Sequence, residues 1–146
     1  MDNRPKRILF IDDEKDVLES IKCVLELKNK FIVDAFSDGE SALKATVEKI
    51  MTAYDLVLLD IKMPGIDGFE LYQRIKEKAP QMKVAFITAS EIERKELEEK
   101  LPNEKENIEM ILIRKPIRIS SLIERINSLI RAKDSNINKI SAESNA

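Results

Sequence analysis

The sequence predicts an α/β domain in which a five-stranded parallel sheet carries helices on both faces. Its 146 residues are enough for one domain with a substantial core and too few for two. Five short apolar runs alternate with segments whose apolar residues recur at helical spacing, which is typical of repeated βα units. The runs end at Asp12, Ser37, Asp60, Thr88 and Lys115, at intervals of 25, 23, 28 and 27 residues, each about one such unit.

The apolar runs are rich in branched side chains, which favours strands buried on both faces. We expect them over residues 6–12, 31–37, 55–60, 83–90 and 109–116. In "KMPGIDG", Gly65 suits a turn that needs a positive φ, and Asp67 is placed to cap the helix that begins at Gly68.

The helical segments each show one apolar face. We expect helices over residues 16–30, 40–51, 68–80, 91–102 and 119–133. Their expected apolar residues include Val17, Ile21, Val24, Leu25 and Leu27 in the first, Phe69, Leu71, Tyr72 and Ile75 in the third, Ile92, Leu97 and Leu101 near or in the fourth, and Leu122, Ile123, Ile126, Leu129 and Ile130 in the last.

Composition excludes several classes of function. The formal net charge is −2, so the sequence indicates neither a nucleic-acid surface nor a membrane-attracting patch. No apolar run is long enough for a membrane span or a signal peptide. The single cysteine, Cys23, excludes an internal disulfide and favours the cytoplasm. The absence of histidine excludes His-based catalytic triads and metal sites with histidine ligands. Residues 134–146 are polar and are expected to form a flexible tail.

The polar residues that end the strands are predicted to meet. Right-handed crossovers place the carboxyl ends of parallel strands on one edge of the sheet, where doubly wound domains bind ligands. Residues from most of the chain can therefore converge there: Asp12, Asp13, Asp60, Thr88 and Lys115.

This set of side chains suits phosphoryl chemistry. Three neighbouring carboxylates repel one another, and a hard divalent ion such as Mg²⁺ removes the conflict. Asp12 and Asp13 are then metal ligands, and Asp60 is free to attack phosphorus and form an acyl phosphate. Lys115 would neutralise phosphoryl oxygens, and the Thr88 hydroxyl would donate to one of them.

Each of these residues also has an ordinary explanation. An Asp-Asp pair at a strand end is usually solvated surface, a strand threonine is usually a β-branched packing residue, and a lone lysine is usually exposed. The Pro64-Gly65 pair alone indicates a simple turn. The joint pattern favours function, because the ordinary explanations do not predict polar residues at these strand ends together.

Five stretches in order resemble the receiver domain of two-component response regulators. They are "ILFIDDE", "FSDGESAL", "DLVLLDIKMPGIDGFEL", "VAFITAS" and "IRKP", and the resemblance covers residues 6–133. It implies a flavodoxin-like, doubly wound sheet of order 2-1-3-4-5. It also implies that Asp60 accepts a phosphoryl group from a sensor histidine kinase or a His-containing phosphotransfer protein.

The resemblance further implies roles for individual residues. Mg²⁺ is held by Asp13, Asp60, the backbone carbonyl of Lys62 and, through water, Asp12. Thr88 and Lys115 are the phosphate-sensing pair, and the Lys115–Pro116 bond is usually cis in this family.

On this interpretation the domain is a signalling module that catalyses its own phosphorylation and dephosphorylation, and not a turnover enzyme. Phosphorylation would switch the surface after Thr88 for an unidentified output protein. The face formed by the fourth helix, fifth strand and fifth helix is the candidate homodimer surface. The cognate kinase, the signal and the oligomeric state do not follow from the sequence.

Three departures from the family pattern bear on switching. Leu112 stands where relatives commonly carry an aromatic residue that moves with the threonine. "LPNEKENIE" makes the stretch between Thr88 and Lys115 longer than usual. Lys62 and Ser90 flank the path of hydrolytic water, at positions that vary in the family, so the lifetime of the phosphoryl group stays open.

Two alternatives remain. The first is a receiver-like interaction module that no longer takes phosphate, which the altered stretch and Leu112 favour and the intact acidic set opposes. The second is a phosphatase of the haloacid-dehalogenase type. That family needs a D-x-D motif after its first strand, and "IDDEK" lacks the second aspartate at that spacing.

Overall fold

Five parallel strands form one sheet in the order β2-β1-β3-β4-β5, which confirms the predicted topology. The structure is a computed structural model and describes residues 4–29, 31–46, 48–89 and 91–132. Its strands are β1 (Arg7–Ile11), β2 (Ile32–Phe36), β3 (Leu56–Leu59), β4 (Val84–Thr88) and β5 (Leu112–Arg114). The expected tail over 134–146 and the residue Ser90 lie outside the described residues.

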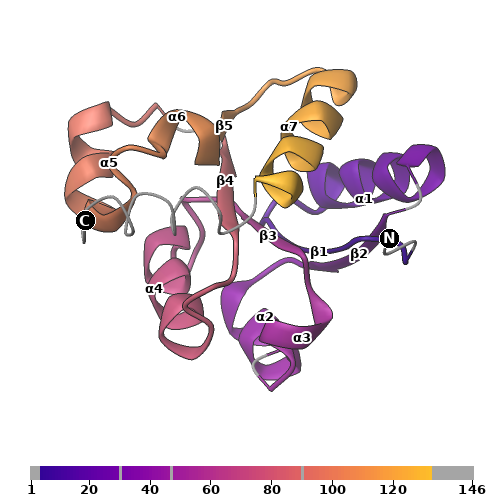
Figure 1. The fold of residues 1–146 in the computed structure, drawn as a ribbon, viewed down its shortest axis with the longest axis horizontal. Coiled ribbons are helices and arrows are strands. Elements are labelled where there is room, and N and C mark those ends of the chain that lie inside the picture. The colour runs from indigo at the N-terminus through magenta and orange to yellow at the C-terminus, as the bar shows by residue number, and fades with distance from the viewer. Residues whose placement is uncertain (1–3, 30, 47, 90, 133–146) are drawn as a thin grey trace, which may run out of the picture.

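Helices cover both faces of the sheet, as predicted (Figure 1). α1 and α7 lie on one face, α2, α3 and α4 on the other, and α5 and α6 lie at the β4–β5 end. Their bounds are α1 (Lys15–Asn29), α2 (Gly39–Thr46), α3 (Ile50–Ala53), α4 (Gly68–Lys78), α5 (Arg94–Lys100), the 3₁₀ helix η1 (Pro102–Glu104), α6 (Ile108–Ile111) and α7 (Ile119–Arg131). Within the described ranges, no helix is long and apolar enough to span a membrane.

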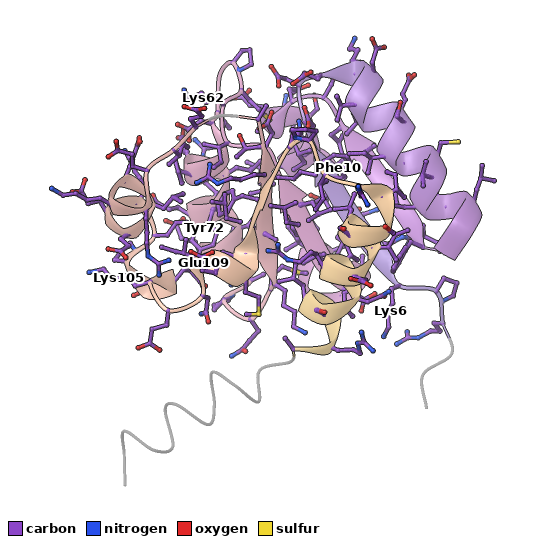
Figure 2. All side chains as sticks on the ribbon, turned by 90° about the horizontal axis from the view of Figure 1, so that it is seen from above. Lys6, Phe10, Lys62, Tyr72, Lys105 and Glu109 are labelled. Atoms are coloured by element: carbon purple, nitrogen blue, oxygen red, sulfur yellow. The ribbon has the colours of Figure 1, made fainter. Side chains whose placement is uncertain are left out.

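The strand register aligns the strand ends that carry the predicted site residues. Ile11 pairs with Phe36 on one side and with Leu59 on the other, so the next residues, Asp12 and Asp60, leave the sheet at the same level. Leu59 in turn pairs with Phe86, and Thr88 pairs with Arg114. Figure 2 shows the two ends of the sheet, with Lys6 before β1 at one end and Lys62 after β3 at the other.

The core lies on both faces of the three central strands. β3 and β4 are buried along their whole length, and β1 is buried from Ile8 to Ile11. The rings of Phe69 and Tyr72, both on α4, lie 5.8 Å from the ring of Phe86 on β4. Continuous apolar burial of this kind holds the strand ends at fixed positions, because close-packed side chains leave little room for displacement.

The expected helix over residues 40–51 is wrong, because the chain forms two shorter helices there. α2 ends at Thr46 and α3 begins at Ile50, with a turn in which the Lys49 amide donates to the Thr46 carbonyl at 3.0 Å. The Thr46 hydroxyl donates to the Ala42 carbonyl at 2.6 Å. Side-chain hydrogen bonds of this kind compete with regular helix geometry, and no glycine or proline marks the break in the sequence.

The expected strand over residues 109–116 begins later than predicted. Ile108–Ile111 form the single-turn helix α6 instead. Helix ends leave carbonyl groups without partners inside the helix. Here Arg125 Nη2, from α7, donates to the carbonyls of Glu109, Met110 and Leu112 at 2.9, 2.6 and 3.2 Å, so a distant residue satisfies this helix end.

Leu27 does not belong to the buried face of α1, contrary to expectation. Its exposed fraction is 77%, whereas Leu18, Ile21 and Leu25 are buried. Side chains two positions apart in a helix point to nearly opposite sides, so Leu25 and Leu27 cannot lie on one face. The expected apolar residues of α4 are buried, and so are Ile92, Leu97 and Leu101. In α7, Leu122, Ile126 and Leu129 are buried, and Ile123 and Ile130 are half-buried.

Candidate functional site

Three carboxylates meet at the carboxyl edge of the sheet. Asp12, Asp13 and Asp60 each offer an oxygen atom, and these atoms lie within 4.8 Å of one another. Asp12 is fully buried and Asp60 is 5% exposed, whereas Asp13 is partly exposed. The backbone fixes the two buried residues, because the Asp12 amide donates to the Phe36 carbonyl at 3.1 Å and the Asp60 amide to the Ile11 carbonyl at 2.9 Å.

Lys115 brings a positive charge to the same place from the far end of the sheet. Its ammonium nitrogen lies 2.6 Å from Asp12 Oδ2 and 3.9 Å from Glu14 Oε1. The lysine side chain is 13% exposed, so little water screens the attraction to Asp12. The Lys115 amide donates to the Thr88 carbonyl at 2.8 Å, which extends the β4–β5 ladder up to the site. The Lys115–Pro116 bond is cis, as the resemblance implied.

Thr88 completes the group of residues that the sequence predicted would converge. It is the last residue of β4 and is 1% exposed. Its side chain makes a hydrogen bond with Asp60, which stabilises the charged form of that carboxyl group. We call Asp12, Asp13, Asp60, Thr88 and Lys115 together the acidic site.

Asp60 is electrostatically unusual. Burial raises the pKa of its carboxyl group to about 6, and the negative charge of Asp12 adds to the rise. Lys115, the Ile61 amide and Thr88 act in the opposite direction but do not restore the ordinary value. A second positive charge at this place would therefore be favourable, and oxygen donors held this close together fit a hard divalent ion such as Mg²⁺.

The loop after Asp60 is held against the site by Gly68. Its amide donates to the Ile61 carbonyl at 2.7 Å, and a Cβ atom at this position would lie 2.3 Å from the Asp60 carbonyl oxygen. Gly65 adopts φ +78°, and Asp67 Oδ1 accepts from the Glu70 amide at 2.9 Å, so both predictions for the loop are confirmed. Lys62 extends an exposed side chain from this loop, and the role of its carbonyl as a metal ligand stays a prediction.

The sequence interpretation missed one neighbour of the site. Glu14 faces Lys115, and its amide donates to Asp12 Oδ1 at 2.9 Å. This local bond fixes the rotamer of the buried aspartate. The motif "IDDEK" carried the signal, because a residue two places after an aspartate is well placed to donate its amide to that side chain.

Comparison with known families identifies one match that covers most of the chain. A family model described as "Response regulator receiver domain" matches residues 8–127. The transcriptional regulatory protein DltR of Streptococcus agalactiae is 38% identical over 84 residues, which are 57% of this chain and 35% of DltR. The response regulator receiver protein CpdR of Brucella abortus is 39% identical over 83 residues, 57% of this chain and 66% of CpdR. The chain thus spans about a third of the length of a regulator such as DltR, since the match covers 35% of it.

Solved structures agree with this match. A CheY-like response regulator receiver domain protein from Methanospirillum hungatei superposes with a TM-score of 0.74 at 26% identity, covering 91% of this chain and 99% of that one. A receiver domain protein from Clostridium thermocellum gives a TM-score of 0.72 at 30% identity, covering 87% and 95%.

Proposed function

Because the chain belongs to the response regulator receiver domain family, we propose that it is a phospho-accepting switch of a two-component phosphorelay, with Asp60 as the phosphoacceptor. Receiver domains of this family are signalling modules and not classical enzymes. One observation carries the proposal for this chain: three carboxylates with oxygen atoms within 4.8 Å of one another lie beside Lys115 at the ligand-binding edge of the sheet.

We assign the metal ligands to Asp12, Asp13, Asp60 and the Lys62 carbonyl. The oxygen donors and the raised pKa of Asp60 support Mg²⁺ as the ion. When bound, Mg²⁺ would neutralise the carboxylates and the phosphoryl oxygens. Lys115 already pairs with Asp12, so the ion and Lys115 would together balance the negative charge of the site.

In the proposed reaction, a carboxylate oxygen of Asp60 attacks the phosphorus of a phosphohistidine in a kinase or phosphotransfer protein. An O–P bond forms and the P–N bond breaks, and the phosphohistidine ring, protonated on its other nitrogen, leaves as neutral imidazole. Lys115 would move its charge toward the phosphoryl oxygens, and the Thr88 hydroxyl would turn from Asp60 to donate to one of them. We place this exchange in the cytoplasm, without direct nucleic-acid or membrane contact.

The output would be a change at the surface that follows Thr88, with an unidentified protein as the partner. A homodimer through the face of α5, β5 and α7 is part of the same proposal. The family match favours a receiver over a haloacid-dehalogenase phosphatase. The intact acidic site favours a working receiver over a module that no longer takes phosphate.

The decisive experiment is intact mass spectrometry after incubation with acetyl phosphate and Mg²⁺. The wild-type chain should gain a single phosphoryl adduct, and Asp60→Asn should gain none. An adduct on both chains would place the phosphoacceptor elsewhere. No adduct on either, with acetyl phosphate or with a phosphorylated kinase, would favour the module that no longer takes phosphate.

A further inference from the structure

Polar side-chain contacts connect different parts of residues 94–111 to one another. This segment comprises α5, η1 and α6, and we call it the α5–α6 segment. Arg94 contacts Glu98 Oε1 at 3.1 Å and Glu109 Oε1 at 2.6 Å, which joins the start of the segment to its end. Asn107 Nδ2 donates to Glu104 Oε2 at 3.2 Å. Arg125 of α7 also donates to the Glu109 and Met110 carbonyls, so the α6 end of the segment is anchored to the rest of the fold.

The hydroxyl group of Tyr72 connects α4 to this segment. The Tyr72 hydroxyl donates to Glu104 Oε1 at 3.0 Å, and Tyr72 is 9% exposed while Glu104 is half-buried. Figure 2 shows Tyr72 on the same side of the molecule as Lys105 and Glu109. Burial raises the pKa of Tyr72, and the charge of Glu104 raises it further, so the phenol stays protonated and remains a donor.

The same tyrosine also touches the strand that leads to the acidic site. Its ring lies 5.8 Å from that of Phe86, which is two residues before Thr88 and therefore on the same face of β4. Phe86 pairs in the sheet with Leu112, which carries no polar atom on its side chain. A displacement of the end of β4 would therefore move the Tyr72 ring and could break the hydrogen bond of its hydroxyl group. Leu112 has no side-chain hydrogen bond that such a displacement could break.

We propose that the Tyr72–Glu104 hydrogen bond is a latch that holds the α5–α6 segment closed, and that a phosphoryl group on Asp60 opens it. This inference rests on the proposed function of Asp60. The closed latch would hold the surface in its resting form. Its rupture would free the segment for an output partner, and by linkage the latch would oppose phosphoryl binding.

The chain offers a matched pair of tyrosines for the test. Tyr54 is the other tyrosine, and its hydroxyl donates to Asp34 Oδ2 at 2.6 Å, which joins the residue directly after α3 to β2. Tyr72→Phe and Tyr54→Phe therefore each delete one hydroxyl that is bonded to a carboxylate and keep the ring. Hydrogen exchange of the 146-residue chain then separates loss of the latch from general loosening.

Without ligand, we expect Tyr72→Phe to speed amide exchange in residues 97–111 about tenfold, and Tyr54→Phe to leave those residues unchanged. Glu104→Leu, which removes the acceptor, should act at least as strongly as Tyr72→Phe, and the double variant should match Glu104→Leu, because both changes remove the same bond. Equal acceleration by both tyrosine variants, or none by Tyr72→Phe, would overturn the latch.

With Mg²⁺ and beryllofluoride, a stand-in for the phosphoryl group, exchange in residues 97–111 of the wild type should rise toward the Tyr72→Phe value. Tyr72→Phe should also bind beryllofluoride about fivefold more tightly. If fluorine NMR shows that beryllofluoride binds but amide exchange in residues 97–111 does not change, the latch is wrong and the proposed function stands. If beryllofluoride does not bind, the proposed function and the coupling of the latch to Asp60 both fail.

Discussion

The acidic site and the α5–α6 segment are held in place by different kinds of interaction. At the acidic site, buried side chains stand on a rigid sheet, and Asp12 and Thr88 are 0% and 1% exposed. In the segment, apolar residues such as Leu97 and Leu101 are buried, but the Arg94–Glu109 ion pair lies at the surface, with side chains 50% and 86% exposed. Buried polar groups are costly to unpair, whereas exposed ion pairs are exchanged with water at little cost. The difference indicates a fixed chemical centre beside a surface that can rearrange.

The largest effect is expected from a methyl group placed at Gly68. In Gly68→Ala, the new Cβ would meet the Asp60 carbonyl oxygen at 2.3 Å and the Ile61 Cα at 2.8 Å, both in the backbone. We expect a loss of stability of about 3 kcal/mol or more, and weaker phosphorylation because Asp60, the proposed phosphoacceptor, shifts.

Gly65→Ala in the same loop is the matched control. Nothing lies within 4 Å of its Cβ position, so only the positive φ of 78° resists the change, at about 1 kcal/mol. Urea unfolding of both variants checks the order, and equal losses would contradict the close approach at Gly68.

Removal of the Lys115 charge comes next. Lys115→Ala leaves the fully buried Asp12 carboxylate without its 2.6 Å partner, and a buried charge without a partner costs about 3 kcal/mol. Urea unfolding at pH 7 without Mg²⁺ measures the loss, and added Mg²⁺ should recover part of it. A loss no larger than that for an exposed ion pair would mean that Asp12 is better hydrated than its burial indicates.

The pH dependence of Asp60→Asn tests the electrostatics of the acidic site. The pKa of Asp60 is raised to about 6 in the folded state, so the native protein binds this proton more tightly than the unfolded chain. Below pH 4 the carboxyl group therefore does not lower the free energy of unfolding. The free energy of unfolding falls as the pH rises from there through about 6, because the folded protein must then hold a buried charge. Relative to wild type, Asp60→Asn should gain about 2 kcal/mol between pH 4 and pH 7.5 without Mg²⁺. A difference in unfolding free energy that does not change with pH would refute the raised pKa.

Much of the acidic site could be predicted because its residues are close to strand ends. A short apolar run that stops at Asp12 or Asp60 is visible in the sequence, and parallel topology alone then brings the ends together. The α5–α6 segment was harder, because its structure depends on distant partners. The apolar run around Ile111 resembles a strand, and it becomes helix α6 where Arg125, far along the chain, satisfies the carbonyl groups.

The details that position the acidic site were only partly predictable. The turn at Gly65 and the cap at Asp67 follow from residue types that favour them. The need for glycine at position 68 arises from its contact with the Asp60 carbonyl, which exists only after β3 and α4 have packed. The Tyr72–Glu104 hydrogen bond joins residues 32 positions apart, and no local sequence pattern predicts it.

Mg²⁺ should stabilise the fold by a smaller amount. At ten times its dissociation constant, the ion adds about 1.4 kcal/mol if it binds only the folded state. Thermal melts with and without Mg²⁺ measure this gain for the wild type. Asp13→Asn should lose most of the response, because it removes one ligand of the proposed set. An identical response in both proteins would exclude Asp13 from the site.

The smallest effect is expected in the α5–α6 segment, from Arg94→Ala. The 2.6 Å contact with Glu109 is short, but the glutamate is 86% exposed, so water and salt compete for both charges. We expect a loss of about 0.5 kcal/mol that fades at high ionic strength, against about 3 kcal/mol for Lys115→Ala. Urea unfolding at low and high salt measures both variants. If Arg94→Ala costs as much as Lys115→Ala, the segment is as rigid as the acidic site, and a surface that rearranges beside a fixed centre is no longer tenable.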